Sequence, residues 1–600
     1  MATPLSQHPP QLPLSETNAP VAEPAAPPAT LAALMIDTAV RLGVTTWVIS
    51  PGSRSAPLTA ALAQRDDITR YVIYDERSAG YVALGLAQQL RAPVGLVCTS
   101  GTAALNYGPA VAEAFYQAIP LLVLTADRPP EWIDQQDNQA IHQNGLYGAH
   151  VRASFTLPVD DGHPDTRWHA VRTVADALQM ATSATPGPTH INVHLREPLY
   201  AAARAPIVRP QRLATAAQTA PQLAAAEWDS VRTAMAAARS VLVVGGPQPP
   251  DARLHAALAS LGDEHPLVVI GDITANLWPA AGAIQQWDAL LSMHDAPALH
   301  PELVISFGGP VTSRGLKALL RTHAPQEFWR VGPGLPAPDT FQTLNRVLPL
   351  HPADFFASLA NKLQANPGQR DDMQAARTDY ANQWRGHARA TSAALGAALD
   401  ELPFGEFAAM RAIFGAMPKG TLLQLGNSMP IRYANLLALS RDHLPSATYA
   451  NRGVSGIDGC VSTAVGAALA SPHALTLLLV GDLSFFYDRN GLWHRHLPPN
   501  LRIVLLNNHG GGIFDIIDGP QTLPDDLRHD YFLTPQSLKA QRTAEDHGLR
   551  YFSADNAGAL TESLPRFFAP ADSAAILEIE SDMALNTSTF RAVRARIAQL

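Results

Sequence analysis

Short apolar runs alternate with longer alanine-rich segments from residue 31 onward. In the first third of the chain, the runs occupy residues 46–50, 71–76, 94–101, 121–127 and 190–195. Brief continuous runs rich in Val, Ile and Leu are typical of strands buried on both faces of a sheet, and the segments between them are long enough for helices. The pattern therefore predicts an α/β domain with a parallel sheet.

Two further series of runs repeat this pattern. The second comprises 240–246, 266–272, 302–309 and 328–332, and the third comprises 421–427, 447–453, 475–482, 501–508 and 575–580. We therefore predict three successive Rossmann-like domains, each built on a parallel sheet. The predicted divisions are a disordered leader at 1–30, a first α/β domain at 31–200, a linker at 201–226, a central α/β domain at 227–366, a helical connector at 367–402 and a third α/β domain at 403–600.

Composition limits the partners of this chain. The formal net charge is −9 and the sequence pI is about 6.1, so there is no general basic field to recruit nucleic acid or anionic membranes. Cys98 and Cys460 are the only cysteines, which excludes a disulfide framework and fits a reducing compartment. No apolar run reaches the roughly 18 to 20 residues of a membrane helix. The leader contains eight prolines and no Lys or Arg, unlike targeting segments, so we expect a cytoplasmic protein.

Polar residues end two of the predicted strands in the third series. Asp482 closes the run at 475–482, and Asn508 closes the next run along the chain. Because parallel strands bring their carboxyl ends to one edge of a sheet, these side chains and the carbonyl of Gly510 would form a set of hard oxygen ligands for Mg²⁺ or Mn²⁺. The alternative is that Asp482 caps a helix and Asn508 belongs to a turn.

At this point the chain resembles the thiamine diphosphate-dependent enzymes, whose signature is Gly-Asp-Gly followed by Asn-Asn. Here Leu483 replaces the second glycine. A narrower resemblance is carried by SPGSRSAPLT (50–59), DERSAGYVALGLA (75–87), TSGTAALNYGPAVAEA (99–114), ADRPPE (126–131), NQAIHQ (138–143), NRGVSGIDG (451–459) and VGDLSFFYD (480–488). These segments resemble the 2-succinyl-5-enolpyruvyl-6-hydroxy-3-cyclohexene-1-carboxylate synthase family, in which Gly-Asp-Leu-Ser is the usual metal motif. The resemblance extends from about residue 31 to the C-terminus.

The resemblance also implies which residues bind thiamine diphosphate. The pyrimidine ring of thiamine diphosphate is bound by the first domain, where Glu76 shares a proton with the ring, and the diphosphate is bound by the third domain of another subunit. Ile457 matches the bulky aliphatic residue that bends the cofactor. Further cofactor-binding residues implied by the match are Ser428, Gly481, Asp482, Ser484, Asn508 and Gly510. The active protein would be a homodimer or a dimer of dimers. From local sequence alone, Glu76 could equally be an ordinary glutamate in the first turn of a helix.

The implied reaction is decarboxylation of 2-oxoglutarate, followed by 1,4-addition of the resulting succinic semialdehyde carbanion to isochorismate, in menaquinone biosynthesis. Both substrates are dicarboxylates, and the planar fork of arginine suits carboxylates. The expected anion pocket contains Ser53, Arg54, Arg128, Gln139, Ser428, Arg432 and Arg452. In the central domain the family often has two adjacent basic residues, whereas here Gly315 follows Arg314, so the role of Arg314 is open.

Two other functions are compatible with this pattern. One is another thiamine diphosphate-dependent 2-oxoacid decarboxylase or carboligase, such as an acetolactate synthase with a flavin in its central domain. The other is a noncatalytic metabolite-binding protein on the same fold, because fold alone does not define activity. The joint presence of Glu76, Asp482 and Asn508 favours an enzyme, since a binding module has no need for a proton-sharing glutamate.

Overall fold

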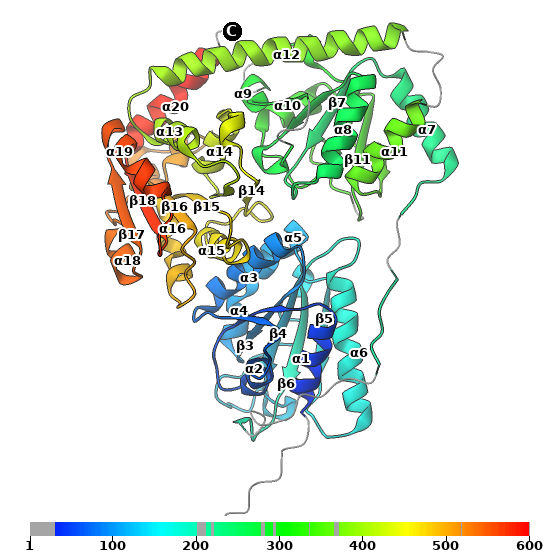
Figure 1. Ribbon diagram of the computed structural model, residues 1–600, viewed down its shortest axis with the longest axis vertical. Coiled ribbons are helices and arrows are strands. Elements are labelled where there is room, and N and C mark those ends of the chain that lie inside the picture. The colour runs from blue at the N-terminus through cyan, green and yellow to red at the C-terminus, as the bar shows by residue number, and fades with distance from the viewer. Residues whose placement is uncertain are drawn as a thin grey trace, which may run out of the picture.

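The computed structural model describes residues 30–200, 212–217, 221–277, 282–291, 296–334, 337–364, 371–517 and 519–598. Residues 1–29 of the predicted leader, and residues 201–211 and 218–220 of the predicted linker, lie outside these ranges. The described chain forms three six-stranded sheets in which all paired strands are parallel. The predicted fold class is thus confirmed, and we refer to the units built on these sheets as the first, middle and third domains (Figure 1).

The strands follow one another regularly along the chain. The first sheet contains β1 (Thr46–Ile49), β2 (Thr69–Val72), β3 (Val94–Cys98), β4 (Leu121–Asp127), β5 (Ala153–Leu157) and β6 (Thr189–His194). The middle sheet contains β7 (Val241–Gly245), β8 (Val268–Gly271), β9 (Ala283–Ile284), β10 (Leu303–Phe307), β11 (Glu327–Val331) and β12 (Arg346–Leu348). The third contains β13 (Leu422–Leu425), β14 (Ala447–Ala450), β15 (Thr476–Gly481), β16 (Leu501–Asn507), β17 (Arg550–Ala554) and β18 (Ala575–Glu580).

Helices cover the faces of these sheets. The first domain has α1 (Leu31–Arg41), α2 (Ala56–Ala63), α3 (Glu76–Leu90), α4 (Thr102–Asn106), α5 (Gly108–Gln117) and α6 (Pro164–Ala181). The middle domain has α7 (Ala225–Ala237), α8 (Ala252–Glu264), α9 (Trp287–Leu291), α10 (Arg314–Thr322) and α11 (Pro352–Gln364). The long helix α12 (Asp371–Asp400) lies along both the middle and third domains in Figure 1. The third domain has α13 (Glu406–Ala416), α14 (Met429–Leu436), α15 (Cys460–Ala470), α16 (Asp482–Tyr487), α17 (Asp525–Arg528), α18 (Gln541–Asp546), α19 (Ala557–Phe568) and α20 (Met583–Ile597).

Four strands escaped prediction, namely β5, β9, β12 and β17, and each lies at an edge of its sheet. An edge strand is covered on fewer sides, so its sequence need not be a continuous apolar run. In β5, for example, exposed residues alternate with less exposed ones. One predicted boundary was also wrong, because β2 ends at Val72 and Glu76 begins a helix rather than ending a strand.

The three sheets have two different strand orders. The first sheet runs β2-β1-β3-β4-β6-β5, and the third runs β14-β13-β15-β16-β18-β17, which is the same order. The middle sheet runs β12-β11-β10-β7-β8-β9, the order of dinucleotide-binding Rossmann domains. The first and third domains are therefore a topological pair, and the Rossmann order belongs to the middle domain alone.

Ligands in such sheets bind where the strand order reverses. In the middle domain this point lies between β7 and β10, and the loops after these strands pack on each other. A Cβ atom on Gly246 would lie 2.0 Å from the carbonyl oxygen of Gly309. The amide of Gly309 also donates to the carbonyl of Pro247 at 2.8 Å. The two loops are therefore in backbone contact at the point where the strand order reverses.

The first and third domains share one hydrophobic core through a close crossing of α3 and α15. A Cβ atom on Gly85 of α3 would lie 2.1 Å from the carbonyl oxygen of Thr463, and one on Gly466 of α15 would lie 2.1 Å from that of Val82. No real Cβ atom can approach a backbone oxygen so closely, so the crossing requires glycine on both helices. None of the described helices is long and apolar enough to span a membrane.

We predict that Gly85→Ala destabilises the protein, because the added methyl group must push α3 away from α15. Overpacking of this kind costs roughly 1 to 3 kcal/mol, which should lower the midpoint of thermal unfolding. Gly386→Ala is the matched control, since nothing lies within 4 Å of a Cβ atom at Gly386 of α12. There the replacement should raise the midpoint or leave it unchanged. Equal behaviour of the two variants would contradict the tight crossing.

Candidate active site

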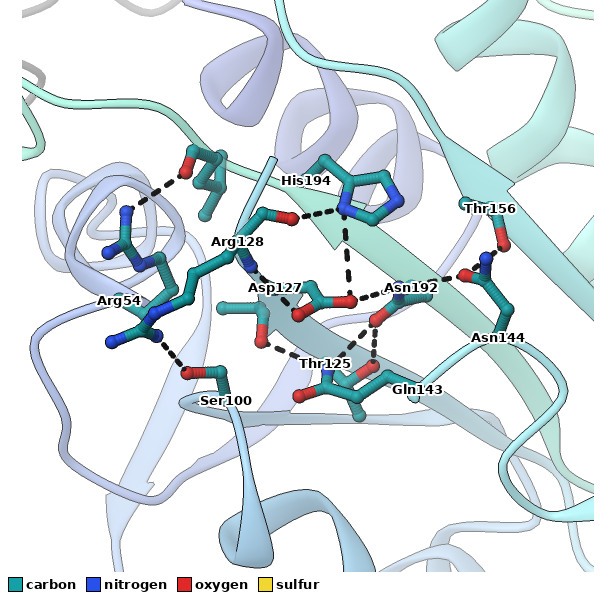
Figure 2. A network of polar contacts seen from close by, with 12 residues as sticks. Arg54, Ser100, Thr125, Asp127, Arg128, Gln143, Asn144, Thr156, Asn192 and His194 are labelled. Atoms are coloured by element: carbon teal, nitrogen blue, oxygen red, sulfur yellow. Dashed lines mark hydrogen bonds and ion pairs between the residues drawn. The ribbon is translucent and has the colours of Figure 1, made fainter. Parts of the chain in front are cut away.

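The first group of candidate residues lies at the carboxyl edge of the first sheet. Ser53 and Arg54 follow β1, and Arg128 follows β4 (Figure 2). Both arginines are buried, whereas Ser53 is exposed. Arg54 donates to the carbonyl of Leu195 at 3.1 Å and lies 3.5 Å from the carboxylate of Glu197. Burial lowers the pKa of Arg54, and the nearby charge of Arg128 lowers it further. Two neighbouring guanidinium groups of this kind favour an anion between them.

Arg128 is fixed from several sides. Its Nε donates to Asp137 at 2.6 Å, and its Nη1 donates to the hydroxyl of Ser100 at 2.7 Å. The backbone is also fixed, because the carboxylate of Asp127 accepts from the Arg128 amide at 2.8 Å and His194 Nδ1 donates to the Arg128 carbonyl. Figure 2 shows Ser100, Asp127 and His194 around Arg128. A charged group held in one orientation loses little entropy on binding an anion.

Gln139 lies beside this group in a strained conformation. Its φ is +60°, a region that non-glycine residues rarely adopt. Its side-chain nitrogen donates to the carbonyl of Ser100 at 3.0 Å. Nearby, Gln143 accepts from the amide of Gly101 at 2.8 Å and donates to Asn192 at 2.9 Å. The loop that carries Gln139 is therefore tied to the strand edge through a buried amide network.

Glu76 is the first residue of α3, directly after Asp75, which caps the helix by accepting from the amide of Ser78. The Glu76 side chain is half-buried. Burial raises its pKa, a hydrogen bond from its own backbone amide opposes the rise, and the charge of Asp75 adds to it. A carboxyl group whose proton is favoured in this way is suited to sharing a proton with a ring nitrogen.

The second group lies at the carboxyl edge of the third sheet. Asp482 directly follows β15, and Asn508 directly follows β16; these strands pair in parallel, with Gly481 opposite Leu506. Both side chains are buried, at 3% and 8% exposure. The Asn508 side-chain oxygen accepts from the amide of Gly510 at 3.1 Å. The structure thus brings Asp482, Asn508 and Gly510 to one sheet edge, and burial raises the pKa of Asp482.

The donor atoms at this edge fit a hard divalent cation. Within the described ranges there is no cluster of three or more His, Cys, Asp or Glu side chains, so the candidate set is one carboxylate with an amide and a backbone oxygen. The nitrogen of the Asn508 side-chain amide donates to Glu406 at 2.8 Å, and its oxygen, which accepts from the amide of Gly510, has a second lone pair for a metal. Gln536 donates to Asp482 at 2.7 Å, so a cation would compete with Gln536 for that carboxylate.

Glu406 was not among the predicted site residues. It is the first residue of α13, is buried, and also accepts from the hydroxyl of Tyr433 at 3.1 Å. Burial raises its pKa to about 7, the hydrogen bond from Tyr433 opposes the rise, and the charge of Asp482 adds to it. Nothing in the local sequence marks Glu406 or Gln536, because their contacts with the sheet edge span about a hundred and about fifty residues respectively.

The loop at 451–459 lies next to the metal candidates. Ile457 is half-buried, and its carbonyl accepts from the hydroxyl of Ser484 at 2.7 Å. Ser484 itself is buried on α16. At Gly481 nothing lies within 4 Å of an added Cβ atom, so this glycine keeps the strand end open rather than relieving a contact.

Arg432 and Arg452 of the third domain and Arg314 of the middle domain are close enough for their charges to interact. Burial lowers the pKa of Arg432, and the charges of Arg452 and Arg314 lower it further. Arg432 donates to the carbonyl of Ser428 at 2.5 Å, and Arg452 donates to the side chain of Asn427 at 3.2 Å. Ser428 has a φ of +72°, a strained conformation of the kind that concentrates at functional sites. Arg314, whose role the sequence left open, thus lies within electrostatic reach of Arg432.

Among the described residues the two groups share no direct polar contact, although Asp75 and Arg77, the neighbours of Glu76, bond to Asn490 and to the carbonyl of Tyr487 at the end of α16. In the described part of the molecule, no hydrogen bond or ion pair joins Ser53, Arg54, Glu76, Arg128 or Gln139 to Ser428, Arg432, Arg452, Ile457, Asp482 or Asn508. Each group belongs to a single domain, the first five residues to the first domain and the other six to the third domain.

The sequence of this chain is similar to known proteins of one enzyme family. Residues 29–146 match the model of the thiamine pyrophosphate enzyme N-terminal TPP binding domain. The 2-succinyl-5-enolpyruvyl-6-hydroxy-3-cyclohexene-1-carboxylate synthase of Cytophaga hutchinsonii is 39% identical over 93% of this chain and 97% of its own length.

The enzymes of the same name from Desulfotalea psychrophila and Porphyromonas gingivalis agree with this. The Desulfotalea enzyme is 40% identical over 85% of this chain and 90% of its own length. The Porphyromonas enzyme is 36% identical over 91% of this chain and 94% of its own length. Because these alignments cover 85 to 93% of this chain, they include all three domains. The chain belongs to the 2-succinyl-5-enolpyruvyl-6-hydroxy-3-cyclohexene-1-carboxylate synthase family of thiamine diphosphate enzymes.

Proposed function

We infer that this chain is a 2-succinyl-5-enolpyruvyl-6-hydroxy-3-cyclohexene-1-carboxylate synthase of menaquinone biosynthesis. It releases CO₂ from 2-oxoglutarate and adds the remaining four-carbon unit to isochorismate in a 1,4 sense. The observation that carries this inference is the 39% identity to the Cytophaga hutchinsonii enzyme, over nearly the full length of both chains. Thiamine diphosphate, when bound, supplies the stabilised carbanion that this chemistry requires.

The third domain would hold the diphosphate end of the cofactor. Asp482, Asn508 and the carbonyl of Gly510 would bind Mg²⁺ or Mn²⁺, since all three present oxygen atoms at one sheet edge. Ser428, Gly481 and Ser484 line the neighbouring strand ends and loops, and Ile457 would support the bend of the cofactor.

The first domain would hold the pyrimidine ring. Glu76 is suited to share a proton with the ring nitrogen because burial favours its protonated form. The resemblance to thiamine diphosphate enzymes, in which the ring and the diphosphate of one cofactor are held by different subunits, supports a site that is shared between subunits. We therefore propose a homodimer or a dimer of dimers.

The substrates would be held by charge. Two pairs of arginines, buried Arg54 with Arg128 and half-buried Arg432 with Arg452, offer separate places for carboxylate groups in a chain whose net charge is −9. Exposed Ser53 and strained Gln139 add neutral hydrogen-bonding groups beside the first cluster.

The proposed activity is tested by supplying thiamine diphosphate, Mg²⁺, 2-oxoglutarate and isochorismate, and by measuring CO₂ release and the adduct. We expect product formation that depends on every component. Equal or faster turnover of pyruvate would instead indicate another decarboxylase or carboligase of the superfamily. Failure to turn over any 2-oxoacid, with the cofactor bound, would indicate a binding protein.

We predict that Glu76→Gln lowers kcat by at least about 100-fold, because general acid–base groups contribute about 10² to 10⁴ in rate. The amide keeps the size of the side chain but cannot exchange a proton with the ring. Thiamine diphosphate affinity, measured by calorimetry, should change much less than kcat. Unchanged turnover would remove Glu76 from the chemistry.

We predict that Asp482→Asn weakens thiamine diphosphate binding by about tenfold or more in the presence of Mg²⁺, because the site loses its only carboxylate ligand. Removal of divalent ions with a chelator should weaken binding by the wild-type protein similarly, and should have little further effect on the variant. Asp572→Asn, which removes one exposed carboxylate from the same domain, should bind normally. If Asp482→Asn retained the full Mg²⁺ dependence, the metal site would have to lie elsewhere.

A further inference from the structure

Glu113 lies on α5 of the first domain, yet its carboxylate contacts the backbone of the third domain. Its Oε1 accepts from the amide of Gly453 at 2.6 Å, and its Oε2 accepts from the amide of Val454 at 2.7 Å. Gln117, one turn further along α5, donates to the same carboxylate at 2.6 Å. The Glu113 side chain is fully buried. A buried carboxylate that accepts three hydrogen bonds is held in a single orientation.

The contacted amides belong to the loop at 451–459, which is held at each end by its own domain. Asn427 donates to the carbonyls of Asn451 and Gly456, at 2.7 Å and 2.6 Å. Beyond them, Ser484 holds the carbonyl of Ile457. Between these anchors, the amides of Gly453 and Val454 are held by Glu113. The first domain therefore supplies the contact at the centre of this loop.

The fit at this contact is close. A Cβ atom on Gly453 would lie 2.8 Å from the carbonyl oxygen of Glu113 and 3.0 Å from its Oε1. Only glycine lets the loop approach α5 so nearly. The contact is also next to a charge, because Glu113 and Asp272 both raise the pKa of Arg452 against the larger lowering effect of burial.

We propose that Glu113 is a positioning residue, which clamps the loop at Gly453 and Val454 and thereby fixes Arg452 in the anion pocket of the third domain. Arg452 directly precedes the clamped amides and has one side-chain hydrogen bond, to Asn427. Because the clamp comes from the first domain of the same chain, dicarboxylate binding at the third domain depends on how those two domains are packed. The proposal rests on the proposed function for the role of Arg452.

The clamp itself is tested without any assay of activity. In Glu113→Gln one of the two backbone amides loses its acceptor and faces an NH₂ group. Hydrogen exchange of a peptide covering 451–459 should then be faster than in the wild-type protein by about tenfold or more, since hydrogen bonds to charged groups are worth about that factor. Peptides from β13 and β15 should exchange as before. Unchanged exchange at 451–459 would overturn the clamp.

The functional consequence is tested by kinetics with 2-oxoglutarate and isochorismate. Glu113→Gln should raise KM for at least one dicarboxylate by about tenfold, with a smaller effect on kcat and on thiamine diphosphate affinity. Glu113→Asp distinguishes the hydrogen bonds to the loop from the negative charge. It keeps the carboxylate, but the side chain is shorter by one methylene group and no longer reaches the two amides. The proposal requires Glu113→Asp to share the rise in KM, whereas wild-type values would show that charge alone matters and would overturn it.

Three further variants complete the experiment. Ser484→Ala, which releases the Ile457 end of the loop, should instead weaken cofactor binding. His496→Ala removes a different contact between the first and third domains, the hydrogen bond from the amide of Val72, and should leave both KM values unchanged. Arg452→Lys is the reference. If KM rises in Arg452→Lys but not in Glu113→Gln, the positioning role fails; if it rises in neither, the role proposed for Arg452 fails first.

Discussion

The crossing of α3 and α15 is the constraint on which the rest of the molecule depends. Two glycines bring the helices to backbone contact, so that the first and third domains form one continuous hydrophobic core. Once this crossing is fixed, α5 lies against the loop at 451–459, and Glu76 begins the same helix that contains Gly85. The positions of the catalytic and binding candidates in both domains are therefore set by one apolar contact.

Both sheet edges concentrate features that cost free energy. Arg54, Arg128 and Arg432 are removed from much of the solvent, and Ser428 and Gln139 have left-handed backbones. Such features persist only where the surrounding structure fixes them. Here hydrogen bonds fix the guanidinium groups themselves: Arg128 donates to Asp137 and Ser100, Arg54 to the carbonyl of Leu195, and Arg432 to that of Ser428.

The middle domain contributes differently. It has the Rossmann strand order, and its loops at Gly246 and Gly309 are in backbone contact at the point where that order reverses. What it offers to the third domain is charge, through Arg314 beside Arg432 and Asp272 beside Arg452.

The sequence by itself determined the α/β class, the interior strands and the residues at their carboxyl ends, because a buried parallel strand must be an apolar run and its ligand-facing residues directly follow it. It missed four of the six edge strands, β5, β9, β12 and β17, because an edge strand need not be a continuous apolar run, and it placed Glu76 on a strand rather than at a helix start. Asp127, Gln143 and Glu113 all lie within recognisable motifs, yet their partners could not be read locally. Only the tertiary structure decided that Glu406 orients Asn508 and that Glu113 holds Gly453, since these contacts join residues a hundred or more positions apart and follow from the packing of domains.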